Sequence, residues 1–136
     1  MKTATIVAQM LVRFCGIILI ILGVLFWTGN DLSLVPIHML LGFVLVLALW
    51  VLAGLAAAAG VQPGFVALAI VWGLIVPILG LTQTRLLPGD AHVVIQVVHL
   101  LVGLGAIGQA EGLAARIKSR RHFGDDAAQT PLVGER

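Results

Sequence analysis

Charged residues are scarce in this sequence of 136 residues: they make up 10% of it, whereas 60% of the residues are apolar. Between Asp31 and Arg85 there is no Asp, Glu, Lys or Arg at all. Soluble globular domains have about 25% charged residues, so the composition excludes that class and indicates a membrane protein. Because one helical crossing of a bilayer needs about 20 apolar residues, the uncharged stretch has room for two crossings.

Motifs of soluble enzymes are also absent. The chain has no CxxC, no HExxH, no phosphate-binding glycine loop before a lysine, and no serine near a buried base. The single cysteine, Cys15, lies in an apolar run and excludes an internal disulfide. We therefore expect an electron-transfer or accessory membrane protein, and not a hydrolase or a transferase.

The apolar segments predict an all-α fold, an integral membrane four-helix bundle. Glycine- and proline-containing turns separate them, which gives helices over about residues 8–28, 35–59, 64–82 and 91–116 within a membrane domain of residues 1–117. Residues 118–136 are basic and then polar, so a disordered cytoplasmic tail is expected there.

The basic residues predict the orientation of the bundle. Lys2 and Arg13 lie at the start of the first helix, and a basic cluster follows the last helix: Arg116, Lys118, Arg120 and Arg121. Cytoplasmic segments carry the excess of Lys and Arg, so both termini of this multi-pass protein are expected in the cytoplasm, in the cell (inner) membrane. The cluster indicates contact with anionic lipid of the bilayer, and not with nucleic acid.

Two of the predicted helices carry a histidine followed four residues later by a glycine. The pairs are His38 with Gly42 and His99 with Gly103. This spacing places both residues on one helix face, one turn apart, and the glycine leaves space there for a flat molecule. Two such faces opposed would form a slot with an imidazole on either side. The pattern predicts one haem b, with His38 and His99 as metal ligands, between the second and fourth helices.

Two further residues of the fourth helix bear on this site. Gln96 lies three residues before His99 on the same face, where it could fix the tautomer of the ring by a hydrogen bond. His38 lies about three residues into its helix and His99 about eight, an offset of about 7 Å at 1.5 Å per residue. His92 is level with His38 on this count, so the sequence leaves His92 open as the alternative ligand.

The two halves of the chain show a short internal similarity. An offset of 61 residues superposes the two histidine–glycine pairs, and Ile21-Leu22-Gly23 recurs as Ile78-Leu79-Gly80 in the preceding helices. This pattern is typical of two repeated helical hairpins related by an axis along the membrane normal. In that arrangement the two histidine faces meet at the axis.

The histidine–glycine pairs at 38/42 and 99/103, carried by facing hairpins of four short helices, resemble the cytochrome b561 type and the related copper-resistance membrane domains. The likeness covers only those two helices. It implies a b-type haem, electron transfer, and a quinone or a partner redox protein as electron partner. Members of that group commonly place histidines at both membrane faces. This chain has nothing comparable near its cytoplasmic helix ends, so the resemblance implies at most one haem.

The same residues leave two other interpretations open. The 16 glycines, together with many alanines, suit close helix packing, as in a homo-oligomer or in a non-catalytic subunit of a larger membrane complex. Alternatively, Glu111, His99 and His92 would supply protonatable steps in a small transporter or proton path.

A structural ion pair is expected between Arg13 and Glu111. The first helix leaves one membrane face and the fourth returns to it, so both residues lie one to two turns inside that face. An unpaired charge at that depth is costly, which favours contact between them.

Overall fold

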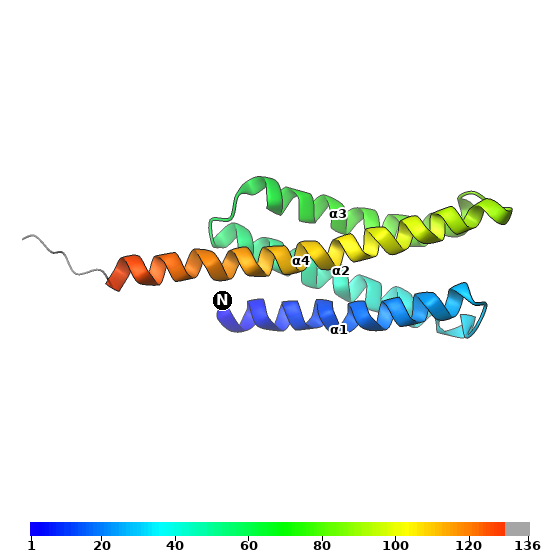
Figure 1. The fold of residues 1–136 in the computed structure, drawn as a ribbon, viewed down its shortest axis with the longest axis horizontal. Helices are drawn as coiled ribbons and strands as arrows, with labels where there is room; N and C mark the ends of the chain where they lie inside the picture. The colour runs from blue at the N-terminus through cyan, green and yellow to red at the C-terminus, as the bar shows by residue number, and fades with distance from the viewer. Residues whose placement is uncertain (130–136) are drawn as a thin grey trace, which may run out of the picture.

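The computed structural model describes the backbone of residues 1–129 and the side chains of residues 1–121. This part of the chain contains no strand, and its four long helices are each apolar enough to cross a membrane. The predicted all-α four-helix membrane bundle is confirmed (Figure 1). The helices are α1 (Lys2–Trp27), α2 (Val35–Ala58), α3 (Pro63–Thr82) and α4 (His92–Gln129), with short 3-10 turns η1 (Leu32–Leu34), η2 (Gln83–Arg85) and η3 (Gly89–Ala91) between them.

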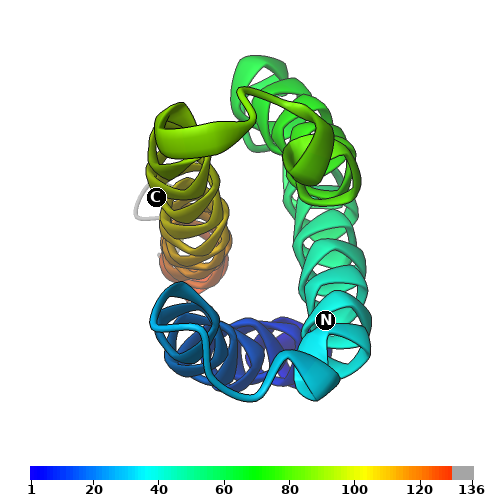
Figure 2. The ribbon, with the colours of Figure 1, turned by 90° about the vertical axis from the view of Figure 1, so that its right-hand side faces the viewer.

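The four helices surround a common axis in chain order. Figure 2, which looks along the bundle, shows α1 beside α2 and α4, and α3 beside the same two helices. α4 contacts α2 as extensively as it contacts α1 or α3. The two helices that carry the histidine–glycine pairs therefore meet across the centre of the bundle.

A glycine cap ends α2 and fixes its connection to α3. Gly60 has a φ of +72°, the left-handed conformation that favours glycine after a helix. Its N–H donates to the Ala57 carbonyl at 3.0 Å, and the Val61 N–H donates to the Ala56 carbonyl at 3.0 Å. This pair of bonds turns the chain back, so that Val61 is buried in the core.

Two helix ends differ from their predicted positions. α1 begins at Lys2 and not near residue 8, because its first turns are buried against the bundle at Thr5 and Gln9 although they are polar. α4 continues to Gln129, past the predicted end at residue 116, because Ile117 is fully buried and a change to basic residues does not end a helix. The predicted disordered tail from residue 118 is therefore helical as far as residue 129, and residues 130–136 lie outside the described residues.

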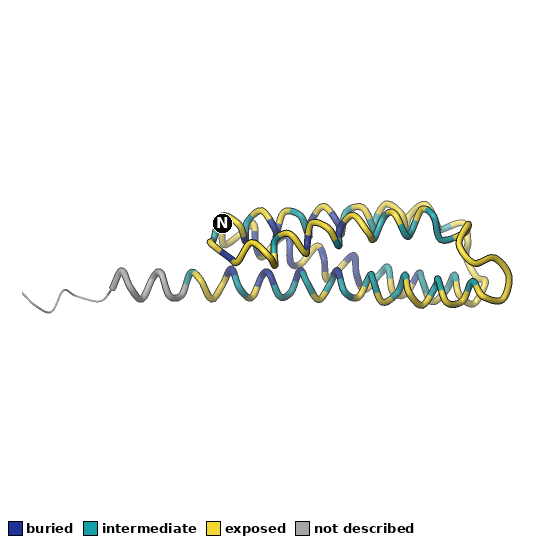
Figure 3. The backbone as a smooth tube through the Cα atoms, turned by 90° about the horizontal axis from the view of Figure 1, so that it is seen from above, coloured by how far each residue is buried: buried dark blue, intermediate teal, exposed yellow. Residues whose placement is uncertain are grey.

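The buried side chains are concentrated in one half of the bundle. Every buried residue of α2 lies within residues 45–56, and those of α4 lie within 106–117 for the side chains that the structure describes. In α1, only Leu22 is buried beyond Gly16. Figure 3 shows the buried segments away from the α1–α2 and α3–α4 connections. The other half, which contains His38 and His99, is loosely packed.

Two tryptophans attach α3 to its neighbours in the same way. Each indole Nε1 donates to a backbone carbonyl three residues before a glycine, and the ring covers that glycine. The groups are Trp50 with Ile70 and Gly73, and Trp72 with Val102 and Gly105. A Cβ on Gly105 would lie 2.7 Å from Trp72 Cζ2, so this glycine is required for the close approach of α3 to α4.

Candidate functional site

His38 of α2 and His99 of α4 face each other in the loosely packed half of the bundle. Their ring centroids are 6.3 Å apart and the ring planes make an angle of 45°. The structure thus brings together the two histidines that the repeated spacing singled out. The offset counted from the helix starts does not keep the rings apart, because α4 begins farther out along the bundle than α2 does (Figure 1).

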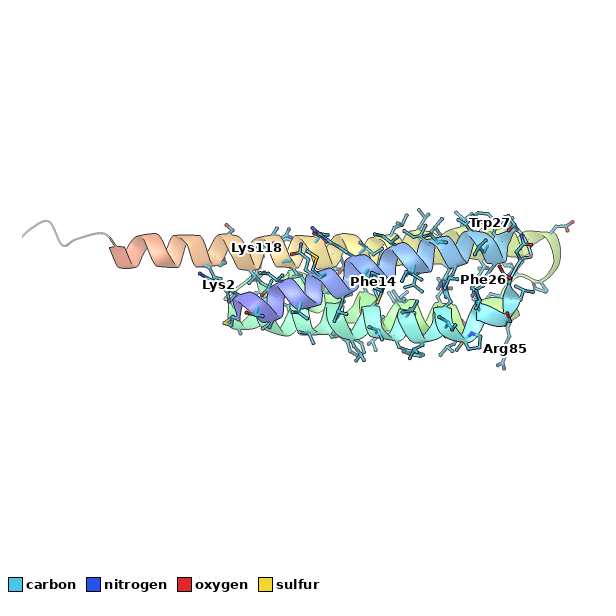
Figure 4. The ribbon with its side chains drawn as sticks, turned by 90° about the horizontal axis from the view of Figure 1, so that it is seen from below. Lys2, Phe14, Phe26, Trp27, Arg85 and Lys118 are labelled. Carbon is cyan, nitrogen blue, oxygen red and sulfur yellow. The ribbon has the colours of Figure 1, made fainter. Side chains whose placement is uncertain are left out.

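All four helices contribute to the surroundings of this histidine pair. Phe26 of α1 packs against the His38 ring edge to face, with centroids 5.4 Å apart. Figure 4 shows Phe26 at the end of the bundle where α1 finishes. On the other side, Gly80 of α3 lies so close to His99 that a Cβ there would be 3.3 Å from His99 Cε1. The two rings are therefore held at the centre of the bundle.

Both rings carry a buried nitrogen that makes no hydrogen bond. The Nδ1 atoms of His38 and His99 have no partner among the described residues. A buried polar atom without a partner costs about 1–3 kcal/mol. Two such atoms therefore lie close together in this half of the bundle.

The glycines one turn after the histidines have open space beside them. A Cβ built on Gly42 or on Gly103 meets no atom within 4 Å. At Gly16 and Gly105, in contrast, a Cβ would collide with a neighbouring side chain. Packing therefore covers some glycines of the bundle, whereas the two glycines one turn after the histidines are among those that it leaves open.

Two predicted site residues are placed differently. His99 Nδ1 has no partner, so the predicted hydrogen bond from Gln96 is not formed. His92 Nδ1 lies 3.2 Å from the Leu86 carbonyl oxygen, which attaches this ring to the α3–α4 connection. Seven residues of helix separate His92 from His99, a distance of about 10 Å.

Phe26 and Gly80 are site residues that the sequence analysis did not identify. Gly80 lies in the segment that repeats residues 21–23, and this repeat was the only feature of the sequence that could have pointed to Gly80 as a site residue. Its counterpart Gly23 has no atom within 4 Å of an added Cβ, so the two hairpins are not equivalent here. Nothing in the sequence marks Phe26.

A second polar group lies in the well-packed half of the bundle. Arg13 Nε donates to Glu111 Oε1 at 2.6 Å, and Arg13 Nη2 donates to Glu111 Oε2 at 2.7 Å. Gln9 Nε2 donates to the same Oε2 at 2.6 Å, and Lys118 Nζ donates to Gln9 Oε1 at 2.9 Å. The structure thus brings together the two residues expected to form an ion pair and adds two polar partners that join α1 to α4.

This arrangement does not form a chain of protonatable groups along α4. Glu111 is twelve residues from His99, or about 18 Å along the helix. Its carboxylate is occupied by Arg13 and Gln9. Glu111, His99 and His92 are therefore not within hydrogen-bond reach of one another.

We expect Glu111→Gln and Arg13→Gln each to lower the thermal stability of the protein in detergent. Glu111→Gln should have the larger effect, because it leaves Arg13 one uncharged amide oxygen in place of a carboxylate, whereas loss of Arg13 leaves Glu111 bonded to Gln9. The double substitution should cost less than the two single effects added together. Strictly additive changes in melting temperature would show that the two groups do not interact.

In the part of the chain that the structure describes, the histidine pair has no third potential metal ligand beside it. Within the described residues, no three side chains of His, Cys, Asp or Glu lie close enough together to hold a metal ion. Protein sites for bare zinc ions use three or four such ligands.

Comparisons of the chain with protein-family models, with curated proteins and with solved structures give no match. The fold and the site define the class as a four-helix membrane bundle with a facing histidine pair between α2 and α4.

Proposed function

We propose that the protein is a membrane b-type cytochrome that binds one haem between His38 and His99 and transfers electrons. The observation that supports this most is the facing pair of imidazoles at the bundle centre, with centroids 6.3 Å apart. A histidine nitrogen lies about 2 Å from a metal that it binds, so two rings that share one metal have centroids about 6 Å apart. When bound, a haem supplies one-electron chemistry.

The chain's own residues have distinct tasks in this proposal. His38 and His99 would hold the haem iron, and Gly42 and Gly103, where an added Cβ meets no atom, would leave space for the group beside their backbones. Phe26 and Gly80 position the two rings from α1 and α3. The surrounding apolar helices keep water from the site, which is one of the means by which proteins tune a haem potential.

A reduced-minus-oxidised spectrum of the purified protein in detergent tests this function. We expect a b-type difference spectrum and about one haem per chain, measured after extraction into pyridine. A protein that stays colourless after expression with added haem precursor and after reconstitution with haemin would contradict the proposal. It would favour the interpretation as a packing subunit of a larger membrane complex.

The proposed orientation has both termini in the cytoplasm and the histidine pair toward the outside of the cell membrane. Figure 4 shows Lys2 and Lys118 toward one end of the bundle and Arg85 at the other. Because Cys15 is buried, single cysteines can be added in its presence. We expect Asn30→Cys to react with an impermeant maleimide on intact cells, and Ser119→Cys to react only after permeabilisation. The opposite pattern would reverse the orientation.

An electron partner is part of the same proposal. The resemblance implies a quinone or a redox protein. Phe26 and His38 lie within two turns of the ends of their helices, next to the connection at residues 28–34. A site so close to the end of the bundle favours electron exchange at that membrane face.

A further inference from the structure

A basic hollow lies at the end of the bundle opposite the histidine pair. It encloses about 210 Å³ between the α2–α3 turn and α4. Among the side chains that the structure describes, its lining contains two arginines, two further polar residues, two apolar ones and no acidic one. The lining residues are Val61, Gln62, Phe65, Arg116, Ser119 and Arg120.

Arg116 is held in a fixed position at this hollow. Its Nη1 donates to the Gly112 carbonyl at 2.9 Å, and its guanidinium carbon lies 3.8 Å from the centre of the Phe65 ring. Arg116 Nη1 also lies close over Gly112, where an added Cβ would be 2.8 Å from it. A guanidinium has five N–H donors in a planar fork, so one bond to Gly112 leaves donors for a ligand. These two contacts hold the guanidinium in one position, unlike that of an arginine surrounded by water.

The other polar groups of the hollow are also suited to an anion. Arg120 lies one helical turn after Arg116 and is exposed. The Ser119 hydroxyl and the Gln62 amide can both donate hydrogen bonds. Arginine forks bind phosphate oxygens with two parallel hydrogen bonds, which makes phosphate the anion that this lining fits best.

The position of the hollow adds an apolar surface to this anion site. It lies where α2 ends and α3 begins, at the limit of the segments that can span a membrane. The outer face of α3 continues from it with exposed apolar side chains, among them Phe65 and Leu68. A ligand with a phosphate and an attached hydrocarbon chain matches both features.

We infer that this hollow binds the phosphate of an anionic phospholipid headgroup, with the acyl chains lying along α3. Arg116 and Arg120 contact the headgroup. The neighbouring basic residues do not take part in the same way: Lys118 is bonded to Gln9 of α1, and Arg121 does not line the hollow. The site is separate from the histidine pair, and its test does not depend on haem.

The binding can be measured by native mass spectrometry of the purified protein with added phosphatidylglycerol or phosphatidylcholine. We expect phosphatidylglycerol to bind more tightly than phosphatidylcholine. Arg120→Gln should weaken the binding of phosphatidylglycerol by about fivefold or more. Arg116→Lys, which keeps the charge but removes the fork, should also weaken it. Arg121→Gln removes the same charge as Arg120→Gln outside the hollow, and should change the affinity by less than about twofold.

Three results would overturn this inference. Equal weakening by Arg120→Gln and Arg121→Gln would show that the lipid responds to net charge and not to the hollow. Equal affinity for the two lipids would show that no anionic headgroup is recognised. The third result concerns inorganic phosphate: if it displaces phosphatidylglycerol at equal concentration, the site selects the free anion and not the lipid.

Discussion

His38→Ala and His99→Ala are each expected to remove the haem absorption of the purified protein, whereas His92→Ala is expected to leave it unchanged. The first two substitutions delete one of the two facing rings. The third removes a ring that is attached to the Leu86 carbonyl in the α3–α4 connection. Even loss of a residue that only supports a metal ligand commonly costs 10- to 100-fold in affinity, so loss of a ligand should lower the haem content by at least about tenfold.

The three histidine variants control for one another. All three should retain the helical circular dichroism of the wild type, because a histidine to alanine change in a helix favours the helical state. If His92→Ala abolished the spectrum and His99→Ala did not, His92 would be the ligand opposite His38. An unchanged spectrum in both His38→Ala and His99→Ala would show that this pair is not the haem site.

The histidine pair could be found from the sequence because each histidine and the glycine four residues later lie on the same helix. A spacing of four residues fixes their relative position whatever the rest of the fold does. The level of His38 against His99 could not be obtained in the same way. It depends on where each helix begins along the bundle axis, and α4 begins farther out along that axis than α2 does (Figure 1).

The contacts around the two rings could not be predicted from the sequence for a related reason. Phe26 and Gly80 come from helices other than those that carry the histidines, so their place depends on how the helices rotate against each other. The predicted bond between Gln96 and His99 depended on a rotamer as well as on the spacing, and it is not formed. Ring contacts of this kind follow from tertiary packing and not from periodicity.

The number of helices followed from the apolar segments, but two of their ends did not. Apolar residues report the thickness of the hydrocarbon layer, whereas a helix continues as long as its turns find partners. The first turns of α1 find them through Thr5 and Gln9, and the end of α4 through Ile117. Residues that pack against a neighbouring helix, polar ones in α1 and Ile117 in α4, therefore extend both helices beyond the predicted membrane segments.

Gly42→Leu and Gly103→Leu should remove haem binding without destabilising the haem-free protein. A Cβ at either position meets no atom within 4 Å, so the fold itself tolerates a side chain there. Leucine also favours the helical state over glycine by up to about 1 kcal/mol. The added side chain would fill the space beside the histidine that the porphyrin needs. We expect at least about a tenfold loss of haem content, as for the histidine variants. The melting temperature should be equal to or above that of haem-free wild type.

Gly54→Leu and Gly105→Leu provide the matched controls for this result. Gly54 is exposed on α2 and a Cβ there also meets no atom, so its variant should bind haem as the wild type does. Gly105 is covered by Trp72, so its variant should lose stability whether or not haem is present. Full haem content in Gly42→Leu and Gly103→Leu would contradict the proposed position of the porphyrin. A loss in Gly54→Leu equal to theirs would mean that any large side chain on these helices disturbs haem binding.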